Sequence, residues 1–333
     1  MSFDLAQPLT ALLRRAGHDV TVEHVTPLSG GASSATFAVD AWRDGAPWSL
    51  IFQRREGVGD ESSGAAGMSK AVQADLQRIA GAHGVPVAAV IAIAGSDDGL
   101  GDGFVMARVA GESLAPRWLK GEAFATARAA LTGQCAAALA RIHAIPLADV
   151  AHLPLSGGSG LDQFAAMFDL YRRLGVEEPV FDLAFAWLRE RVGDAPAGVV
   201  CHGDFRGGNF IVDDRGLAAV LDWELAHLGD HHADLGWLCV NAWRFGRWQK
   251  PVGGFGERAG LYAAYEATGG AAVDPRQAHV AEVYGTLRWG MSCLQLADDH
   301  LSGRVRSVER AAIGRRVSEV AADLLYLLKY GTI

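Results

Sequence analysis

The residues best suited to chemistry lie in one short polar loop between two apolar segments, which read as buried strands. The loop carries His202, Asp204, Arg206 and Asn209, together with three glycines. A further apolar segment along the chain ends at Asp222. Because buried strands hold such a loop in place, polar side chains gathered on it are a common way to build a reactive site.

Each of these residue types has a chemical task. The Asp204 carboxylate can accept the proton of an attacking hydroxyl group. Oxygen atoms of Asn209 and Asp222 suit Mg²⁺, a hard cation that prefers oxygen ligands. Arg206 can place positive charge on a transferred phosphate, and we expect His202 to brace the loop. The pattern is typical of phosphoryl transfer, with Asp204, Arg206 and His202 as catalytic-loop residues and Asn209 and Asp222 as metal ligands.

Further motifs surround the loop and continue into the C-terminal part of the chain. They are Leu221-Asp222-Trp223-Glu224, Gly229-Asp230, Asp234-Leu235, Pro251-Val252-Gly253-Gly254-Phe255-Gly256, Gly285-Thr286-Leu287-Arg288-Trp289-Gly290 and Ala312-Ile313-Gly314-Arg315-Arg316-Val317. With the loop motif His202-Gly203-Asp204, they resemble the aminoglycoside/choline phosphotransferase superfamily. The closer resemblance is to its branch of acyl-CoA-dehydrogenase-associated kinase domains and their bacterial relatives.

The resemblance implies an α+β, bilobal protein-kinase-like fold, with an N-terminal five-stranded antiparallel sheet and helix and a larger, mainly helical C-terminal lobe. We assign residues 1–109 to the nucleotide-binding lobe and residues 110–333 to the catalytic and acceptor-binding lobe. Hydrophobic periodicity predicts strands over 20–28, 35–40, 48–54, 87–94 and 104–109. It predicts helices over 5–16, 69–83, 122–145, 161–174, 179–192, 234–240, 257–268, 275–301 and 307–329.

The nucleotide site is expected in the N-terminal lobe. Backbone N–H groups of a loop that includes Ser29, Gly30 and Gly31 can lie over phosphates. The segment with Met106, Ala107 and Val109 would be the hinge that reads the adenine edge through its backbone. The resemblance implies ATP and Mg²⁺ as cofactors, and GTP stays open because a backbone contact does not distinguish purines.

The third predicted strand lacks the lysine that a kinase would carry there. The whole chain has four lysines, Lys70, Lys120, Lys250 and Lys329. Strand alternation puts Phe52 and Arg54 on one face and Gln53 on the other. We favour adenine over Phe52 and phosphate on Arg54, with Gln53 as the alternative, because arginine binds phosphate well. On the next helix, relatives usually place a glutamate that pairs with the lysine; here either that partner is altered or Asp75 substitutes for it.

The composition is that of a folded globular protein, with 50% hydrophobic and 20% charged residues. A net charge of −8 argues against a nucleic-acid partner. Apolar runs fall short of the ~20 residues that span a bilayer, and the N-terminus shows no signal-peptide pattern. We therefore expect a cytoplasmic protein with no membrane partner. Four isolated cysteines suggest neither a disulfide framework nor a zinc site.

The acceptor is predicted to be a small molecule with a hydroxyl group and an anionic or acyl part. Residues 237–333 carry 12 basic and 9 acidic residues, although the whole chain is acidic. Within this basic part we predict Arg247, Arg288 and Trp289 as acceptor contacts, since cationic acceptors usually meet carboxylates or aromatic cages. The resemblance favours a hydroxyacyl-CoA or a similar hydroxy acid derivative.

Two other functions remain open. The missing lysine and the altered helix partner suit a nucleotide-binding pseudokinase without turnover. Ligand types for transition metals, which would suit a metal-dependent hydrolase, are present in His202, Asp204, His231, His232 and Asp234. For Asp234 we instead favour a structural role, either capping a helix or holding the catalytic loop.

Overall fold

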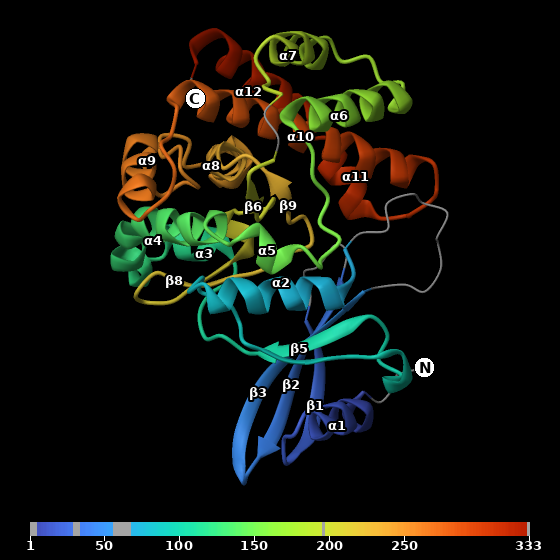
Figure 1. Ribbon diagram of the computed structural model, residues 1–333. Helices are drawn as coiled ribbons and strands as arrows, with labels where there is room; N and C mark the ends of the chain where they lie inside the picture. Colours follow the sequence, from blue (N-terminus) through green and yellow to red (C-terminus); the bar gives the residue numbers. More distant parts are fainter. Residues whose placement is uncertain (1–4, 29–33, 56–67, 195–196, 332–333) are drawn as a thin grey trace.

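The computed structural model describes residues 5–28, 34–55, 68–194 and 197–331. A twisted sheet occupies one end of the molecule and a larger, mainly helical part occupies the other (Figure 1). This arrangement confirms the predicted α+β bilobal fold. The predicted phosphate loop with Ser29, Gly30 and Gly31 lies outside the described residues, and the lobe boundary between residues 109 and 110 stays a prediction.

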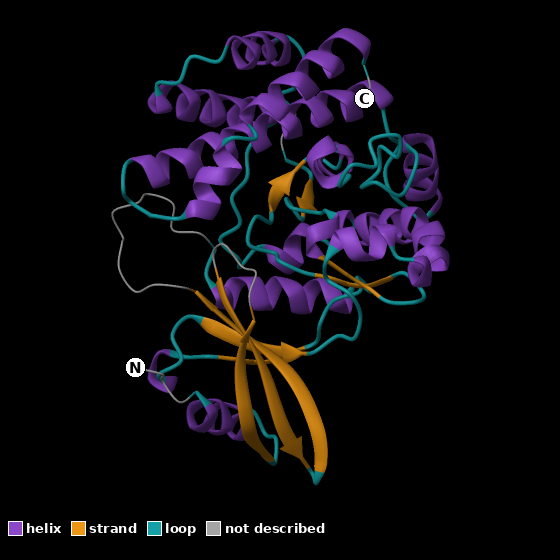
Figure 2. Cartoon of the chain, turned by 180° about the vertical axis from the view of Figure 1, so that it is seen from behind, coloured by secondary structure: helices purple, strands orange, loops and turns teal. Residues whose placement is uncertain are grey.

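The sheet contains five antiparallel strands, as the sequence predicted. Its order is β1 (Val20–Leu28), β2 (Ser34–Arg43), β3 (Ala46–Arg55), β5 (Gly103–Ala107) and β4 (Val90–Ile93). Two helices pack on it, α1 (Ala6–Arg15) and α2 (Lys70–Ala82). Figure 2 shows α1 beside the sheet at its outer end, whereas α2 lies between the sheet and the helical lobe.

Side chains of strand β3 alternate between these two helices. Phe52 is fully buried in a cluster with the leucines of α1. Ile51 packs on the other side, in a cluster with Ala74 of α2 and with Met106. Because side chains alternate with a period of two, Gln53 shares the face of Ile51. The face of Ile51 and Gln53 is therefore the one directed toward α2 and the helical lobe.

The helical lobe holds most of the remaining chain. Its helices are α3 (Ala115–Lys120), α4 (Ala125–His143), α5 (Leu147–Val150), α6 (Gly160–Leu174), α7 (Pro179–Arg189), α8 (His232–Cys239), α9 (Arg258–Ala267), α10 (Pro275–Leu301), α11 (Val308–Gly314) and α12 (Val317–Tyr330). It also contains two small antiparallel sheets, β6 (Val199–Cys201) with β9 (His227–Gly229), and β7 (Phe210–Val212) with β8 (Leu217–Val220). None of the helices in the described ranges has the length and apolar character needed to cross a membrane.

One predicted helix is divided in two. The sequence predicted a continuous helix over 307–329, but α11 ends at Gly314 and α12 begins at Val317. Gly314 lies against Ala297 of α10, where an added Cβ would approach the Ala297 Cβ to 2.5 Å. The chain therefore turns at this close helix–helix contact, which hydrophobic periodicity does not report.

Candidate active site

The predicted polar loop connects β6 to β7, so two short buried strands fix its ends. It turns at Gly203, whose φ of 80° lies in the left-handed region. A Cβ at this position would collide with the carbonyl oxygen of Leu225. Glycine is therefore required here, because other residues resist this conformation and would not fit the space.

Helix α8 supplies the carboxylate that holds the loop. Asp234 is 1% exposed, and it accepts the backbone N–H of His202 at 2.7 Å and that of Gly203 at 2.9 Å. His143 of α4 lies 3.2 Å from the same carboxylate. Burial alone would raise the pKa of Asp234, but the hydrogen bonds from His143 and from the Gly203 N–H hold it well below its usual range. The predicted structural role of Asp234 is confirmed.

Replacement of this carboxylate should destabilise the fold. We expect Asp234→Asn to lower the free energy of unfolding by about 2–4 kcal/mol, because the amide leaves at least one buried donor unsatisfied. Urea unfolding at neutral pH measures the loss. The matched control is Asp162→Asn, which removes an exposed acid that accepts the Ser159 N–H at the start of α6 and should cost about 1 kcal/mol.

The pH dependence of that loss has a definite sign. A carboxylate with a lowered folded-state pKa stabilises the fold above its unfolded pKa, and the stabilisation disappears as the pH falls toward the folded value. The difference between wild type and Asp234→Asn should therefore be largest at neutral pH and shrink by about 1 kcal/mol at about pH 3. A difference that does not change between these conditions would contradict the charged state assigned to Asp234.

His202 braces the loop, as expected. Its ring is fully buried and packs against Phe205 and Trp223. Nδ1 accepts the backbone N–H of Asp204 at 3.2 Å, and Nε2 lies 3.1 Å from the carbonyl oxygen of Leu221. These partners suit a neutral ring with its proton on Nε2, and burial lowers the pKa of His202 accordingly. His202 is therefore a positioning residue, which corrects its place among the catalytic side chains.

Asp204 is held by three donors. Its Oδ1 accepts from Nε of Arg206 and from Nε1 of Trp237, each at 2.8 Å, and its Oδ2 accepts from Nδ2 of Asn209 at 2.6 Å. A carboxylate offers about four lone-pair sites. One site on Oδ2 is therefore left over, and the side chain keeps 10% of its surface exposed. A hydroxyl group can donate its proton at that site.

The oxygen ligands predicted for a metal lie next to this carboxylate. Asn209 also donates from Nδ2 to the Asp204 carbonyl at 3.0 Å, so its Oδ1 is turned away from Asp204. The N–H of Leu221 donates to the Asn209 carbonyl at 2.8 Å, which places Asp222 nearby. Asp222 has a φ of 62°, uncommon for a residue other than glycine and a form of strain often found at functional sites.

The electrostatics of Asp222 fit a bound cation. Burial raises the pKa of this carboxyl to about 6, and the negative charges of Glu224 and Asp204 add to the effect. Carboxylates gathered in a buried place repel one another unless a positive ion lies among them. The oxygen atoms of Asp222 and Asn209 are of the kind that Mg²⁺ prefers. The residues present therefore fit magnesium.

The nucleotide contacts chosen on β3 are wrong. Phe52 is buried against α1, and the guanidinium of Arg54 lies 5.5 Å above the ring of Phe37 on that same outer face. Neither side chain is directed toward the helical lobe. The alternative register, with Gln53 on the inner face, is the one that the structure adopts. Sequence alternation separated the two faces correctly but did not show which face α2 would cover.

Sequence reasoning missed a lysine on the inner side. Lys70, the first residue of α2, is 2% exposed and donates to Oε1 of Gln73 at 2.9 Å. Asp75, by contrast, lies on the exposed side of α2 and pairs with Arg78 at 3.2 Å. Asp75 therefore does not replace the expected glutamate. The scarcity of lysine, together with the position of Lys70 at a helix start, was the available signal.

The segment predicted as the hinge packs on the side of the sheet that faces α2. Met106 is 8% exposed and belongs to the cluster with Ala74, against which Val109 also packs. The N–H of Ala107 donates to the Ala89 carbonyl at 2.8 Å, so this donor is already engaged. Contacts of Met106, Ala107 and Val109 with a nucleotide stay a prediction.

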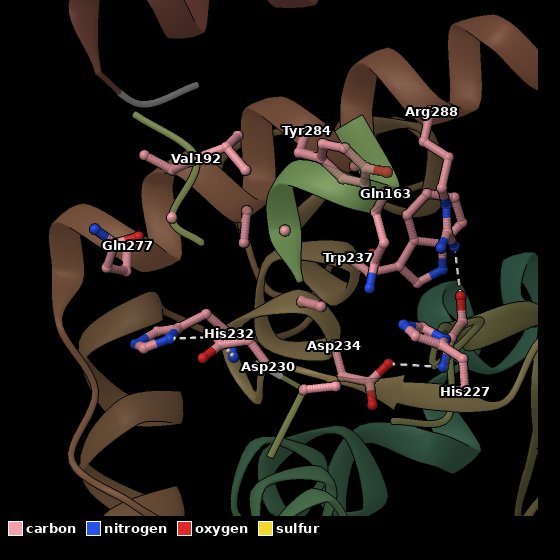
Figure 3. A pocket seen from close by; sticks show the side chains of 18 of the residues that line it. Gln163, Val192, His227, Asp230, His232, Asp234, Trp237, Gln277, Tyr284 and Arg288 are labelled. Atoms are coloured by element: carbon pink, nitrogen blue, oxygen red, sulfur yellow. Dashed lines mark hydrogen bonds and ion pairs between the residues drawn. The ribbon is translucent and has the colours of Figure 1, made fainter. Parts of the chain in front are cut away.

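A cavity of about 370 Å³ opens beside the loop (Figure 3). Small or apolar residues form much of its wall, among them Gly160, Val192, Ala233, Val280, Ala281 and Gly285. Gly203, Trp237 and Arg288 line it next to the catalytic loop. Trp237 connects the cavity to the predicted base, because it lines the cavity and donates to Asp204.

Arg288 carries the positive charge of this cavity. Its guanidinium donates to the Gly203 carbonyl and lies 3.8 Å above the ring of Trp237. Among the described residues it forms no ion pair with a carboxylate. Two acids line the cavity, and both are engaged, because Asp230 hydrogen-bonds His232 and Asp234 holds the loop. The cavity therefore offers a cation without a matching anion.

Two of the three predicted acceptor contacts do not line the cavity. Arg247 donates to the carbonyl oxygen of Leu119 and so caps the end of α3. The ring of Trp289 packs edge-to-face on Trp243 at 4.9 Å. Both residues therefore have structural roles here, and only Arg288 of the predicted set lies at the cavity.

The residues proposed for a hydrolase metal site do not come together. In the described part of the chain, potential ligand atoms cluster in two groups, His143 with Cys201 and Asp234, and Asp230 with His231 and His232. Neither group includes His202 or Asp204. Asp234 is also occupied by backbone donors. The arrangement gives no support to the hydrolase alternative.

Comparisons with known proteins agree with the fold. Residues 24–271 match the family described as "Phosphotransferase enzyme family". A candidate aminoglycoside phosphotransferase from Ralstonia eutropha JMP134 superposes with a TM-score of 0.69 at 20% identity, covering 95% of both chains. The GDP and kanamycin complex of APH(2")-IIia superposes with a TM-score of 0.66 at 15% sequence identity, and the match covers 95% of this chain and 98% of that one. Macrolide 2'-phosphotransferase type I superposes with a TM-score of 0.58 at 19% sequence identity, and the match covers 97% of both chains. The curated proteins give no match.

Proposed function

The chain belongs to the phosphotransferase enzyme family, and from this we propose that it is a kinase that transfers the γ-phosphate of ATP to a hydroxyl group of a small molecule. The observation that carries the proposal is the environment of Asp204. Three donors fix this carboxylate and leave one lone-pair site for the acceptor hydroxyl. Asp204 would take the hydroxyl proton as the oxygen attacks the phosphorus atom.

Three further residues would bind the metal ion or the phosphate groups of the nucleotide. Asn209 and Asp222 would hold Mg²⁺, which neutralises charge on the nucleotide phosphates. Arg206 uses its Nε to hold Asp204, and its terminal nitrogen atoms have no hydrogen bond among the described residues, so they can contact the transferred phosphate. Its stacking on Trp243, 4.7 Å from the ring centre, keeps the guanidinium in place. GTP remains an alternative donor, since one of the structurally similar enzymes holds GDP.

We assign the acceptor to the cavity beside the loop. Its volume of about 370 Å³ suits a small ligand, at the lower end of the usual ~300–1,000 Å³. The charge of Arg288 and the absence of an unengaged carboxylate among the lining residues favour an anionic acceptor over a polycation. The apolar wall suits an acyl or alkyl part. A hydroxy acid or hydroxyacyl derivative meets both requirements.

An acceptor screen tests the function. Purified protein with ATP and Mg²⁺ would be given hydroxy acids, hydroxyacyl thioesters and the polycation kanamycin, and the products would be read as released ADP and by mass spectrometry. We expect phosphorylation of an anionic acceptor and none of kanamycin. Tight nucleotide binding without phosphorylation of any acceptor would favour the pseudokinase alternative. Efficient phosphorylation of kanamycin would contradict the acceptor assignment while leaving the kinase chemistry intact.

Arg288 should determine acceptor affinity. With the best anionic acceptor from that screen, Arg288→Met should raise the acceptor KM by roughly 10- to 100-fold, the effect of losing a hydrogen bond to a charged group. The KM for ATP should change little. Arg288→Lys keeps the charge and should recover part of the loss.

The control for this prediction is Arg304→Met. Arg304 is an exposed arginine in the turn that follows α10, paired with Asp298 and Asp299. Loss of its charge should leave both KM values unchanged. An acceptor KM that responds equally to the two variants would indicate a general effect of protein charge and would remove Arg288 from the site.

A further inference from the structure

Lys70 is a buried ammonium group with unused hydrogen-bond donors. It is 2% exposed, and its one hydrogen bond in the described part of the chain goes to the neutral side chain of Gln73. An ammonium group has three N–H donors, so two remain. Burying a cation with so few partners is costly, and such groups usually serve a ligand or an ion pair.

Its surroundings point toward the predicted phosphate site. Burial lowers the pKa of Lys70, whereas the negative charges of Asp222, Glu224 and Asp102 act in the opposite direction. Asp102 is already engaged, because it accepts the backbone N–H of Lys70 at 2.9 Å and pairs with Arg55 at 3.2 Å. The charges of Lys70 and Asp222 therefore interact, as those of a cation and a metal-binding carboxylate do around a nucleotide phosphate.

The local structure fixes Lys70 in this place. It is the first residue of α2, whose N-terminus is capped by Ser69 accepting the Val72 N–H at 3.3 Å. The first turn of a helix carries partial positive charge, which adds to that of the lysine. Gln73, one turn later, is 3% exposed and holds Lys70 through Oε1 and the Met68 carbonyl through Nε2. The cation is thus pre-positioned by neutral partners.

Strand β3 has one cation on this side, Arg55, and it is already engaged, because it pairs with Asp102 at 3.2 Å and donates to the Met68 carbonyl at 3.1 Å. The other inward residues near it are the neutral Ile51 and Gln53, and Arg54 lies on the outer face. We propose that Lys70 is the residue that binds the nucleotide phosphates, so that helix α2 supplies the cation that a kinase would carry on β3. This inference rests on the proposed kinase function and names the phosphate-binding residue within it.

The affinities of the protein for ligands with and without phosphate groups test the assignment of Lys70. Calorimetry with ADP and with adenosine, in Mg²⁺ buffer, separates phosphate contacts from base contacts; GDP and guanosine form the parallel pair. We expect Lys70→Met to weaken diphosphate binding by roughly 10- to 100-fold and to leave nucleoside binding unchanged. Lys70→Arg, which keeps a cation, should retain most of the affinity. Since methionine replaces a poorly solvated charge with a side chain of similar length, thermal unfolding should show an intact fold.

Matched variants sharpen the result. Lys120→Met removes an exposed lysine on α3, and Arg54→Met removes the outward arginine, and neither should change ADP affinity. Gln53→Lys in the Lys70→Met background places a lysine on the inner face of β3 and should restore part of the affinity.

Two outcomes would overturn the assignment. One is ADP and GDP affinity within about twofold of wild type in Lys70→Met, and the other is an equal loss for nucleoside and diphosphate. Either would leave the kinase proposal standing. Wild-type protein that binds neither ADP nor GDP would overturn both proposals together.

Discussion

Asp204→Asn is expected to lower turnover by roughly 10²–10⁴-fold, the usual cost of losing a general base. The amide cannot take the hydroxyl proton, and its NH2 group replaces one of two oxygens that now accept hydrogen bonds, Oδ1 from Arg206 and Trp237 or Oδ2 from Asn209. Steady-state turnover with saturating ATP and acceptor measures the effect. The loss should appear in kcat, because the acceptor cavity and the metal ligands are unchanged.

Binding provides the internal control. Asp204→Asn should bind ADP with Mg²⁺ within about twofold of wild type, since Asp204 is assigned to the acceptor hydroxyl and not to the nucleotide. Turnover close to that of wild type would remove Asp204 as the base. A parallel collapse of ADP binding and thermal stability would instead show that the carboxylate mainly holds the loop together.

Asp222→Asn is expected to remove the dependence of nucleotide binding on Mg²⁺. Asparagine tolerates the left-handed backbone of this position, so the change isolates the charge from the conformation. In Mg²⁺ buffer the affinity for ADP should fall by roughly 10- to 100-fold, while the affinity in the presence of a chelator should stay within about twofold. Turnover should fall by about 10²–10⁴-fold, because a metal supplies several kcal/mol of transition-state stabilisation.

Stability separates this effect from misfolding. The raised pKa of Asp222 shows that its charge is unfavourable in the folded protein, so Asp222→Asn should be at least as stable as wild type. Asp75→Asn is the matched control, since it removes an exposed carboxylate from the outer side of α2 and should leave Mg²⁺-dependent binding intact. Equal losses of affinity with and without Mg²⁺ in Asp222→Asn would contradict metal ligation.

The sequence by itself determined the elements whose signals are local. The strand over 20–28 and the helix over 275–301 have the predicted bounds, because alternation and helical periodicity follow from neighbouring residues. Helix α2 begins at Lys70, one residue after the predicted start of the helix over 69–83. The loop from His202 to Asn209 could also be identified in advance, since its polar residues are close in the sequence and its flanking strands are apolar. These features need no knowledge of distant parts of the chain.

Only the tertiary structure decided which side chains share a space. Alternation gave β3 two faces, but the packing of α1 on one and α2 on the other turned Phe52 and Arg54 outward. Arg247 was one of several arginines in a basic segment until its contact with Leu119 made it a helix cap. Lys70 and Asp222 are about 150 residues apart in the sequence, and no local pattern connects them. Their charges interact because α2 packs between the sheet and the helical lobe (Figure 1), a contact that depends on the whole fold.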